Sequence, residues 1–122
     1  MKEPPENKEI EERITMEIIV DAYGPEEQAL GWYYYLENNL QVPFRARCIA
    51  TRTISPLQIG EEVEVVGMPP EEECEDNMCV LINWQGRSLG VRLAQLEGID
   101  VDAETRQAIG DWHYWVARGY QF

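Results

Sequence analysis

The segment with the most evident chemistry spans residues 67–79, GMPPEEECEDNMC, in which five of thirteen residues are acidic. Pro69 and Pro70 lack a backbone N–H and cannot continue a paired strand. We therefore expect the acids that follow to lie on a surface turn between the apolar runs VEVVGM and MCVLINW. They are Glu71, Glu72, Glu73, Glu75 and Asp76. Carboxylates crowded onto one turn repel one another, and a divalent cation would relieve that repulsion.

Calcium suits such a turn because it accepts about six to eight oxygen ligands in a loosely fixed geometry. A flexible acidic loop offers side-chain carboxylates, backbone carbonyls and bound water together. The segment therefore predicts a calcium site. The competing interpretation is a solvated loop that serves only solubility.

A second acidic set follows the last apolar run, where Asp100, Asp102 and Glu104 have the spacing that opens an EF-hand loop, with Asp111 at its twelfth place. The match fails at the sixth place, which is Thr105 rather than glycine, and at the twelfth, where glutamate is usual. We predict that the set contributes to a cation site that is not an EF-hand. The alternative is that Asp102 only caps a helix and Glu104 only complements its dipole.

The cysteines give a weaker metal signal. Cys74 and Cys79 are five residues apart, which is not the usual zinc-knuckle spacing, and His113 is the single histidine. No fourth ligand is evident, so we do not expect zinc. Cys48 lies in an alternating apolar pattern and is expected to be buried, whereas the other two are candidates for oxidation-sensitive loop thiols.

The charge balance limits the partners. The chain carries 23 acids against 10 Lys and Arg, a net charge of −13. Such a field disfavours nucleic acid and anionic membranes and favours cations or a basic protein partner. No apolar run is long enough to span a bilayer, and the start MKEPPENKEIEE has no signal-peptide core. We therefore expect a cytoplasmic monomer.

The chain divides into a disordered acidic tail, residues 1–11, and a single domain, residues 12–122. Residues 12–23 fit helical and strand periods equally well. The following Gly24 and Pro25 favour a helix that ends there and a second helix over 25–40. The WYYY cluster at 32–35 could stack on a ligand, but rings at helical spacing more often fill a core.

After Pro43 the apolar period changes to two, which predicts short strands over FRARCIA, EEVEVVGM, MCVLINW and RSLGVRL. Gln85 and Gly86 separate the last two at hairpin length. So few strands indicate a small SH3-like β-barrel rather than a sandwich. A final helix is expected from Ala103 to about Ala117, with His113 packed within it. The predicted class is α+β: a helical pair, the barrel and a C-terminal helix.

Several stretches together resemble the small CcbP-type calcium-binding proteins of cyanobacteria: MEIIVDAY (16–23), GWYYYLE (31–37), PFRARCIA (43–50), VEVVGMPPEEEC (63–74) and DWHYWV (111–116). The resemblance implies a cytoplasmic protein without EF-hands that buffers calcium and takes part in calcium signalling. It covers the three glutamates of PEEEC, while the other ligand candidates rest on charge alone. Four further acids lie in or beside matched stretches and are candidates for another site: Asp21, Glu26, Glu27 and Glu37.

Two other functional classes would place different demands on the sequence. An acidic SH3-like module would recruit a basic protein without specific metal binding, and its binding would depend strongly on salt. An enzyme is not expected, because the chain shows no nucleophile with a base, no phosphate-cradling glycine loop and no metal-ligating histidine set.

Overall fold

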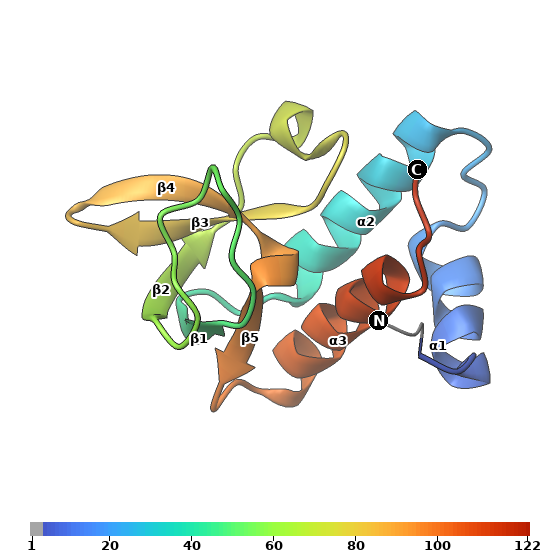
Figure 1. The fold of residues 1–122 in the computed structure, drawn as a ribbon. Helices are drawn as coiled ribbons and strands as arrows, with labels where there is room; N and C mark the ends of the chain where they lie inside the picture. The colour runs from blue at the N-terminus through green and yellow to red at the C-terminus, as the bar shows by residue number, and fades with distance from the viewer. Residues whose placement is uncertain (1–3) are drawn as a thin grey trace.

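A five-stranded antiparallel sheet forms one side of the molecule, and helices form the other (Figure 1). The computed structural model describes residues 4–122. The strands are β1 (Phe44–Cys48), β2 (Glu62–Gly67), β3 (Cys79–Trp84), β4 (Arg87–Arg92) and β5 (Leu96–Ile99). The α-helices are α1 (Lys8–Arg13), α2 (Pro25–Asn39) and α3 (Ala103–Ala117). The predicted α+β class is therefore confirmed.

The N-terminal helical pair is present with shifted boundaries. Helix α1 begins at Lys8, where the Asn7 side chain caps it, and continues as a π-helical turn over Ile14–Ile18. It thus starts four residues before the predicted helix and ends before Tyr23. The hydroxyls of Tyr114 and Tyr120 both donate to Glu11, at 2.6 and 2.7 Å, which holds α1 against the C-terminal end of α3.

The sheet order is β4-β3-β2-β1-β5, with antiparallel pairing throughout. The predicted hairpin is confirmed: Trp84 pairs with Arg87 across a turn in which Gln85 and Gly86 both have positive φ. Two central residues with positive φ match the right-handed twist of a hairpin.

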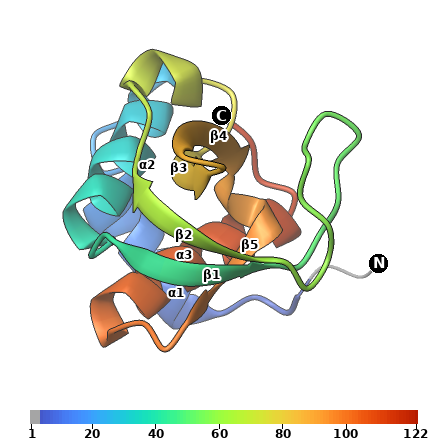
Figure 2. The same ribbon diagram turned by 90° about the vertical axis from the view of Figure 1, so that its left-hand side faces the viewer.

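The predicted barrel is wrong, because the sheet stays open. In residues 4–122 no ladder joins the edge strands β4 and β5. Figure 2 shows the sheet strongly twisted, with β1 and β2 crossing the view and β3 and β4 seen nearly end-on. A closed barrel buries its inner face against itself. Here α2 and α3 cover that face instead, so closure is not needed to bury it.

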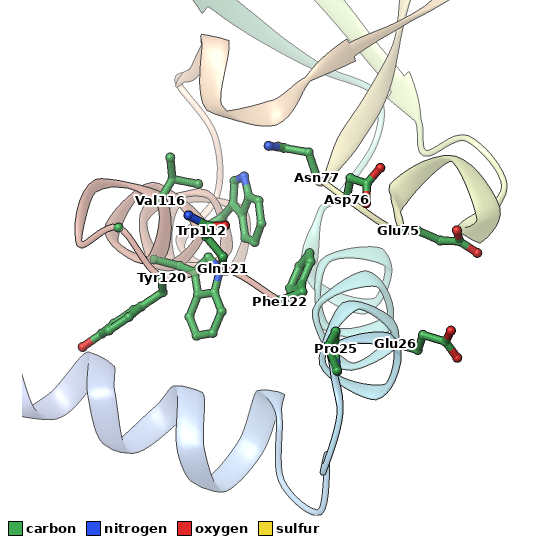
Figure 3. Close-up of a pocket in the computed structure, with 12 residues that line it drawn as sticks. Pro25, Glu26, Glu75, Asp76, Asn77, Trp112, Val116, Tyr120, Gln121 and Phe122 are labelled. Carbon is green, nitrogen blue, oxygen red and sulfur yellow. The ribbon is translucent and has the colours of Figure 1, made fainter.

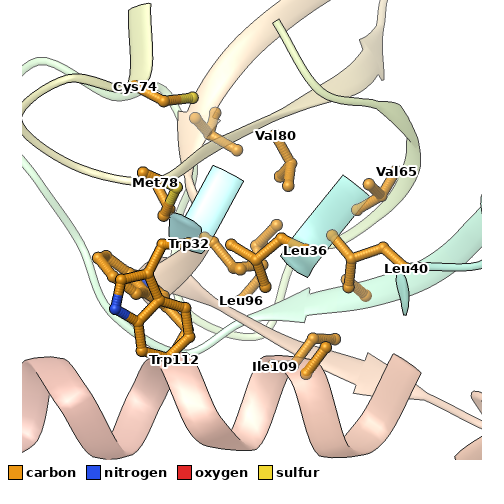
Figure 4. Packing of buried hydrophobic residues seen from close by; sticks show 14 of the residues in the cluster. Trp32, Leu36, Leu40, Val65, Cys74, Met78, Val80, Leu96, Ile109 and Trp112 are labelled. Atoms are coloured by element: carbon orange, nitrogen blue, oxygen red, sulfur yellow. The ribbon is translucent and has the colours of Figure 1, made fainter. Parts of the chain in front are cut away.

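The core lies between the sheet and these two helices (Figure 4). Trp32 and Leu36 of α2 are fully buried and meet Val65, Val80 and Leu96 of the strands. Within the WYYY cluster Trp32 and Tyr33 are buried, while Tyr34 is exposed. The core interpretation of this cluster is therefore confirmed for the first two rings.

A buried ion pair ties the three helices together. Asp111 of α3 accepts two 2.8 Å hydrogen bonds from the guanidinium of Arg13 and one of 2.7 Å from the Tyr35 hydroxyl of α2. The twelfth place of the apparent EF-hand spacing is thus occupied by a structural carboxylate inside a continuous helix. No calcium loop can form there.

In the described part of the chain, no helix has the length and apolar character that crossing a membrane requires.

Candidate metal site

The acidic turn folds as a short 3₁₀ helix, η2 (Glu71–Cys74), followed by an irregular segment that leads into β3. The Pro70 carbonyl accepts a 3.0 Å hydrogen bond from the Glu73 backbone N–H, which closes the turn after the two prolines. Cys74 and Met78 are buried and anchor the segment on both sides of Glu75 and Asp76. The predicted surface turn is therefore confirmed.

The turn lies against α2. The Tyr33 hydroxyl donates to the Pro69 carbonyl at 2.7 Å, and the Tyr34 hydroxyl donates to Oε2 of Glu71 at 2.8 Å. These two bonds fix η2 beside one flank of the helix. Since successive turns of a helix stack along its axis, the acids of η2 come close to the residues that precede Tyr33 by one or two turns.

Glu26, in the first turn of α2, is the acid that this contact brings in. Together with Glu71, Glu72 and Glu75 it lines a cavity of about 140 Å³ that Ala29 and Leu30 complete. None of the described residues that line it is basic. Carboxylates from two elements therefore face one small space, which the sequence separation of 45 or more residues does not suggest.

A second hollow adjoins the first. Glu26 and Glu75 also line a cavity of about 600 Å³. Figure 3 shows the two side chains on the same side, Glu26 on α2 and Glu75 just after η2. Asp76 and Asn77 line this larger space as well. The Asn77 Oδ1 atom is buried and has no hydrogen-bond partner within residues 4–122. An acceptor without a donor beside several carboxylates suits a cation.

The pKa values of two neighbouring tyrosines are raised near these carboxylates. Burial raises the pKa of Tyr33 above its usual 10.0, and the charges of Glu37, Glu71 and Glu72 raise it further. The pKa of Tyr34 is also raised, first by its hydrogen bond to Glu71 and then by that residue's charge. Within residues 4–122, no ion pair neutralises any of the eight acids predicted as ligands.

The second acidic set does not join the first. Asp100 and Asp102 line a separate cavity near Gln41, beyond the C-terminal end of α2, whereas Glu26 marks its beginning. The helix is 15 residues long, which at about 1.5 Å per residue is roughly 22 Å. Arg45 also lines this cavity and opposes a cation there.

Asp102 occupies the predicted N-cap position of α3, but its side chain makes no capping hydrogen bond. Glu104, in the first turn of that helix, accepts a 3.3 Å hydrogen bond from the Gln41 amide. Both carboxylates are exposed. The capping interpretation is therefore confirmed in position but not in its hydrogen bond.

The acids of the η2 cleft are close but not yet arranged around a single point. Across residues 4–122, no three side chains drawn from His, Cys, Asp and Glu are already placed to hold a metal ion. A calcium ion would therefore have to draw the carboxylates inward or complete its shell with carbonyls and water, which its loose geometry allows. The donors available are oxygens, the ligands that calcium prefers, whereas structural zinc sites are built mainly from Cys and His.

The predicted burial of Cys48 is confirmed. Cys74 and Cys79 are not loop thiols as predicted, because Cys74 is buried at the end of η2 and Cys79 is partly exposed at the start of β3. All three are free thiols. The side chains of Cys74 and Cys79 share a hydrogen bond that lowers the pKa of Cys79 to about 7 and raises that of Cys74. His113 contacts the Leu93 carbonyl at 3.4 Å, and burial lowers its pKa.

The sequence predicts Glu26 only as a candidate for another site and gives no signal for Asn77. The signal for Glu26 was present, since an acid in the first turn of a helix that starts at Pro25 must lie at that helix end. The contact between this end and η2 could not be read from spacing. Glu73 was named, but it is exposed and lines neither cavity of the cleft.

An acidic cleft of carboxylate oxygens without an EF-hand loop suits calcium, and the comparisons with known proteins agree. The sequence profile of a family named for CcbP and described as calcium binding matches residues 12–116. The chain therefore belongs to the CcbP family of calcium-binding proteins.

Two solved structures resemble it over almost their whole length. The crystal structure of CcbP from Anabaena is 41% identical with a TM-score of 0.88, and all of both chains is covered. A calcium-binding protein in its calcium-binding form is 43% identical with a TM-score of 0.82, and 95% of each chain is covered. No curated protein sequence matches the chain.

Proposed function

We propose that this protein binds calcium in the cleft between η2 and the first turns of α2, with Glu26, Glu71, Glu72 and Glu75 as the main ligands. The observation that carries this assignment is their shared cavity, which carboxylates from both elements line without a basic residue among its described walls. Asp76 and Asn77, at the edge of the adjoining hollow, would supply further oxygens.

Binding would proceed by convergence. The first turns of α2 form a fixed wall, because Ala29 is buried against the core. The other wall is a short turn anchored at Cys74 and Met78, and its acids lie between or beside these anchors. Repulsion among the carboxylates would hold the cleft open. A bound divalent cation would attract each carboxylate and so draw the two walls together. Glu73 would add to the negative field without direct ligation.

Asp100, Asp102 and Glu104 are proposed as a second and weaker site. The free carboxylate of Asp102 and the adjoining cavity support it. Arg45 nearby lowers the local affinity for cations, although its pairing with Glu62 offsets part of that charge. Two sites of unequal strength would suit a cytoplasmic calcium buffer that also reports calcium levels, acting as a monomer with the ion as its cargo.

The test compares two neighbouring glutamates. Glu26 lines the cleft, whereas the adjacent Glu27 lines neither of its cavities, and both are exposed. Calcium binding is measured by isothermal titration calorimetry for the wild type, Glu26→Gln and Glu27→Gln. Removing one ligand charge should raise the dissociation constant about tenfold in Glu26→Gln, a change that corresponds to roughly 1.4 kcal/mol. Glu27→Gln should stay within about twofold of the wild type, as expected for a distant, screened charge.

Equal losses in both variants would indicate only a general effect of net charge and would refute the location. Excess magnesium serves as the ion control, since the cleft lacks the rigid octahedral arrangement that magnesium demands. The acidic interaction module makes a different prediction: capture of a basic protein that weakens with salt and proceeds without calcium.

A further inference from the structure

Cys74 and Cys79 bracket the part of the acidic turn that carries Glu75 and Asp76. Cys74 ends η2, and Cys79 is the first residue of β3. The Cys74 Sγ donates to the Cys79 carbonyl oxygen at 3.8 Å, and the Cys79 Sγ donates to the Asn77 carbonyl oxygen at 3.7 Å, so both thiols lie against the same short segment. Cys74 Sγ therefore contacts the residue that carries the second thiol, and side-chain rotation is the movement that would bring the two sulfurs together.

Both ends of this pair are fixed by the surrounding structure. Cys74 is 1% exposed and belongs to the core. Cys79 pairs with Arg92 in the β3–β4 ladder, and the preceding Met78 accepts a 3.0 Å hydrogen bond from the Leu93 backbone N–H. The approach of the two sulfurs is thus a property of the folded protein and not of a loose loop.

The two thiols differ in access. Cys79 is partly exposed, whereas Cys74, the last residue of η2, is buried in the core (Figure 4). A small oxidant therefore reaches Cys79 first, and Cys74 is in position to resolve the product. The third thiol, Cys48, is fully buried on β1 and donates to the Ala50 carbonyl, so it takes no part.

We propose that Cys74 and Cys79 form an intramolecular disulfide when the protein meets a peroxide, and that this bond weakens calcium binding in the η2–α2 cleft. The Cys79 sulfur attacks one peroxide oxygen, the O–O bond breaks, and a sulfenic acid and one water form. The Cys74 sulfur then attacks the Cys79 sulfur, the S–S bond forms, and the S–O bond breaks to release a second water. Two thiols lose two electrons in total, and the peroxide accepts them.

The effect on calcium follows from the position of the bond. The carboxylates of the cleft must converge on the ion, because no three of them are already placed to hold it. A disulfide would fix the segment from Cys74 to Cys79 near its present spacing and resist the movement of Glu75 toward Glu26. This second half of the proposal rests on the proposed calcium site.

The experiment treats the full chain with hydrogen peroxide and maps its thiols by mass spectrometry without reduction. The expected product is a monomer that has lost two hydrogen atoms, with a peptide cross-linked between Cys74 and Cys79 and Cys48 still free. In Cys79→Ser no cross-link should form. In Cys74→Ala, Cys79 should stop at the sulfenic acid, which a dimedone probe traps. Stable sulfinic acid at Cys79 of the wild type, or disulfide-linked dimers, would overturn the proposal.

Calcium titration of the reduced and oxidised proteins then separates the two halves. A dissociation constant that rises several-fold on oxidation and returns to its original value with dithiothreitol supports the coupling, and an unchanged constant overturns it. If the disulfide forms but Glu26→Gln leaves the calcium affinity of the reduced protein unchanged, the proposed site fails while the disulfide stands.

Discussion

Replacing Asp111 tests how the three helices are held together. Its carboxylate receives two hydrogen bonds from Arg13 and one from Tyr35, and its side chain is 2% exposed. The bond to this carboxylate raises the pKa of Arg13 above its ordinary value, so the charged pair is favoured in the folded state. Asp111→Ala would leave a guanidinium without its partner in a largely enclosed place.

Breaking a buried pair by removing one member costs about 3 to 5 kcal/mol. The Arg13 side chain is 16% exposed and can turn toward solvent, so the lower end applies. We therefore expect a loss of about 3 kcal/mol in the free energy of unfolding. For a chain of 122 residues this loss corresponds to a fall of roughly 12 °C in melting temperature.

The assay is thermal unfolding by circular dichroism, supported by urea titration. Glu62→Gln is the matched control, because Glu62 pairs with Arg45 and Arg47 at the surface and should contribute below about 1 kcal/mol. The double variant Arg13→Met with Asp111→Leu should be more stable than Asp111→Ala, since it leaves no buried charge unpaired. A loss for Asp111→Ala no larger than that of Glu62→Gln would refute the reasoning.

Two further predictions concern packing and pH. A Cβ added at Gly31 would lie 2.4 Å from the Ile18 carbonyl oxygen, so Gly31→Ala should destabilise the protein by about 1 to 3 kcal/mol in urea unfolding, as overpacking does. A Cβ added at Gly110 in α3 meets no atom within 4 Å, so Gly110→Ala should instead stabilise the protein by up to about 1 kcal/mol. Equal effects of the two substitutions would contradict the close approach of α2 to the π-helical turn. Burial lowers the pKa of His113 in the folded protein below its usual 6.5. As the pH falls, the unfolded chain therefore binds a proton at His113 before the folded protein does. The contribution of the neutral His113 to stability is lost as pH falls from 6.5 through the folded pKa. The melting temperature should therefore fall less between pH 7 and pH 5 in His113→Gln than in the wild type, and an identical slope would contradict the burial argument.

Local chemistry made part of this fold predictable. Pro69 and Pro70 had to interrupt the strand that precedes them, and a turn with buried anchors follows. Gln85 and Gly86 set a hairpin at the expected place because both can adopt positive φ. The change of apolar period after Pro43 marked where helices give way to strands.

Long-range contacts decided the rest. The tail prediction treated residues before Glu12 as polar and unstructured, but Lys8–Arg13 is helical and Glu11 receives hydrogen bonds from two tyrosines more than 100 residues away. The barrel prediction named four strands and missed β5 (Leu96–Ile99), and it could not see that helices would fill the open side. Asp111 appeared in a metal-like spacing, and its true partner Arg13 lies 98 residues away.

In the candidate site, too, local sequence predicts some features and long-range packing decides the others. The acidity of residues 71–76 was evident from the sequence, and the structure keeps them together. The partner acid, Glu26, is set by the packing of η2 on α2 through the hydroxyls of Tyr33 and Tyr34. The separation of the Asp100–Glu104 set from η2 likewise follows from the length of α2, which no local pattern encodes.

The most direct test of the calcium assignment is a crystal structure of the protein grown with calcium, with the ion located by its anomalous scattering. The account predicts an ion between η2 and α2, bound by the carboxylates of Glu26 and Glu75 and at least one of Glu71 and Glu72, at distances of about 2.3 to 2.6 Å. An ion held elsewhere, with these carboxylates left in solvent, would contradict it.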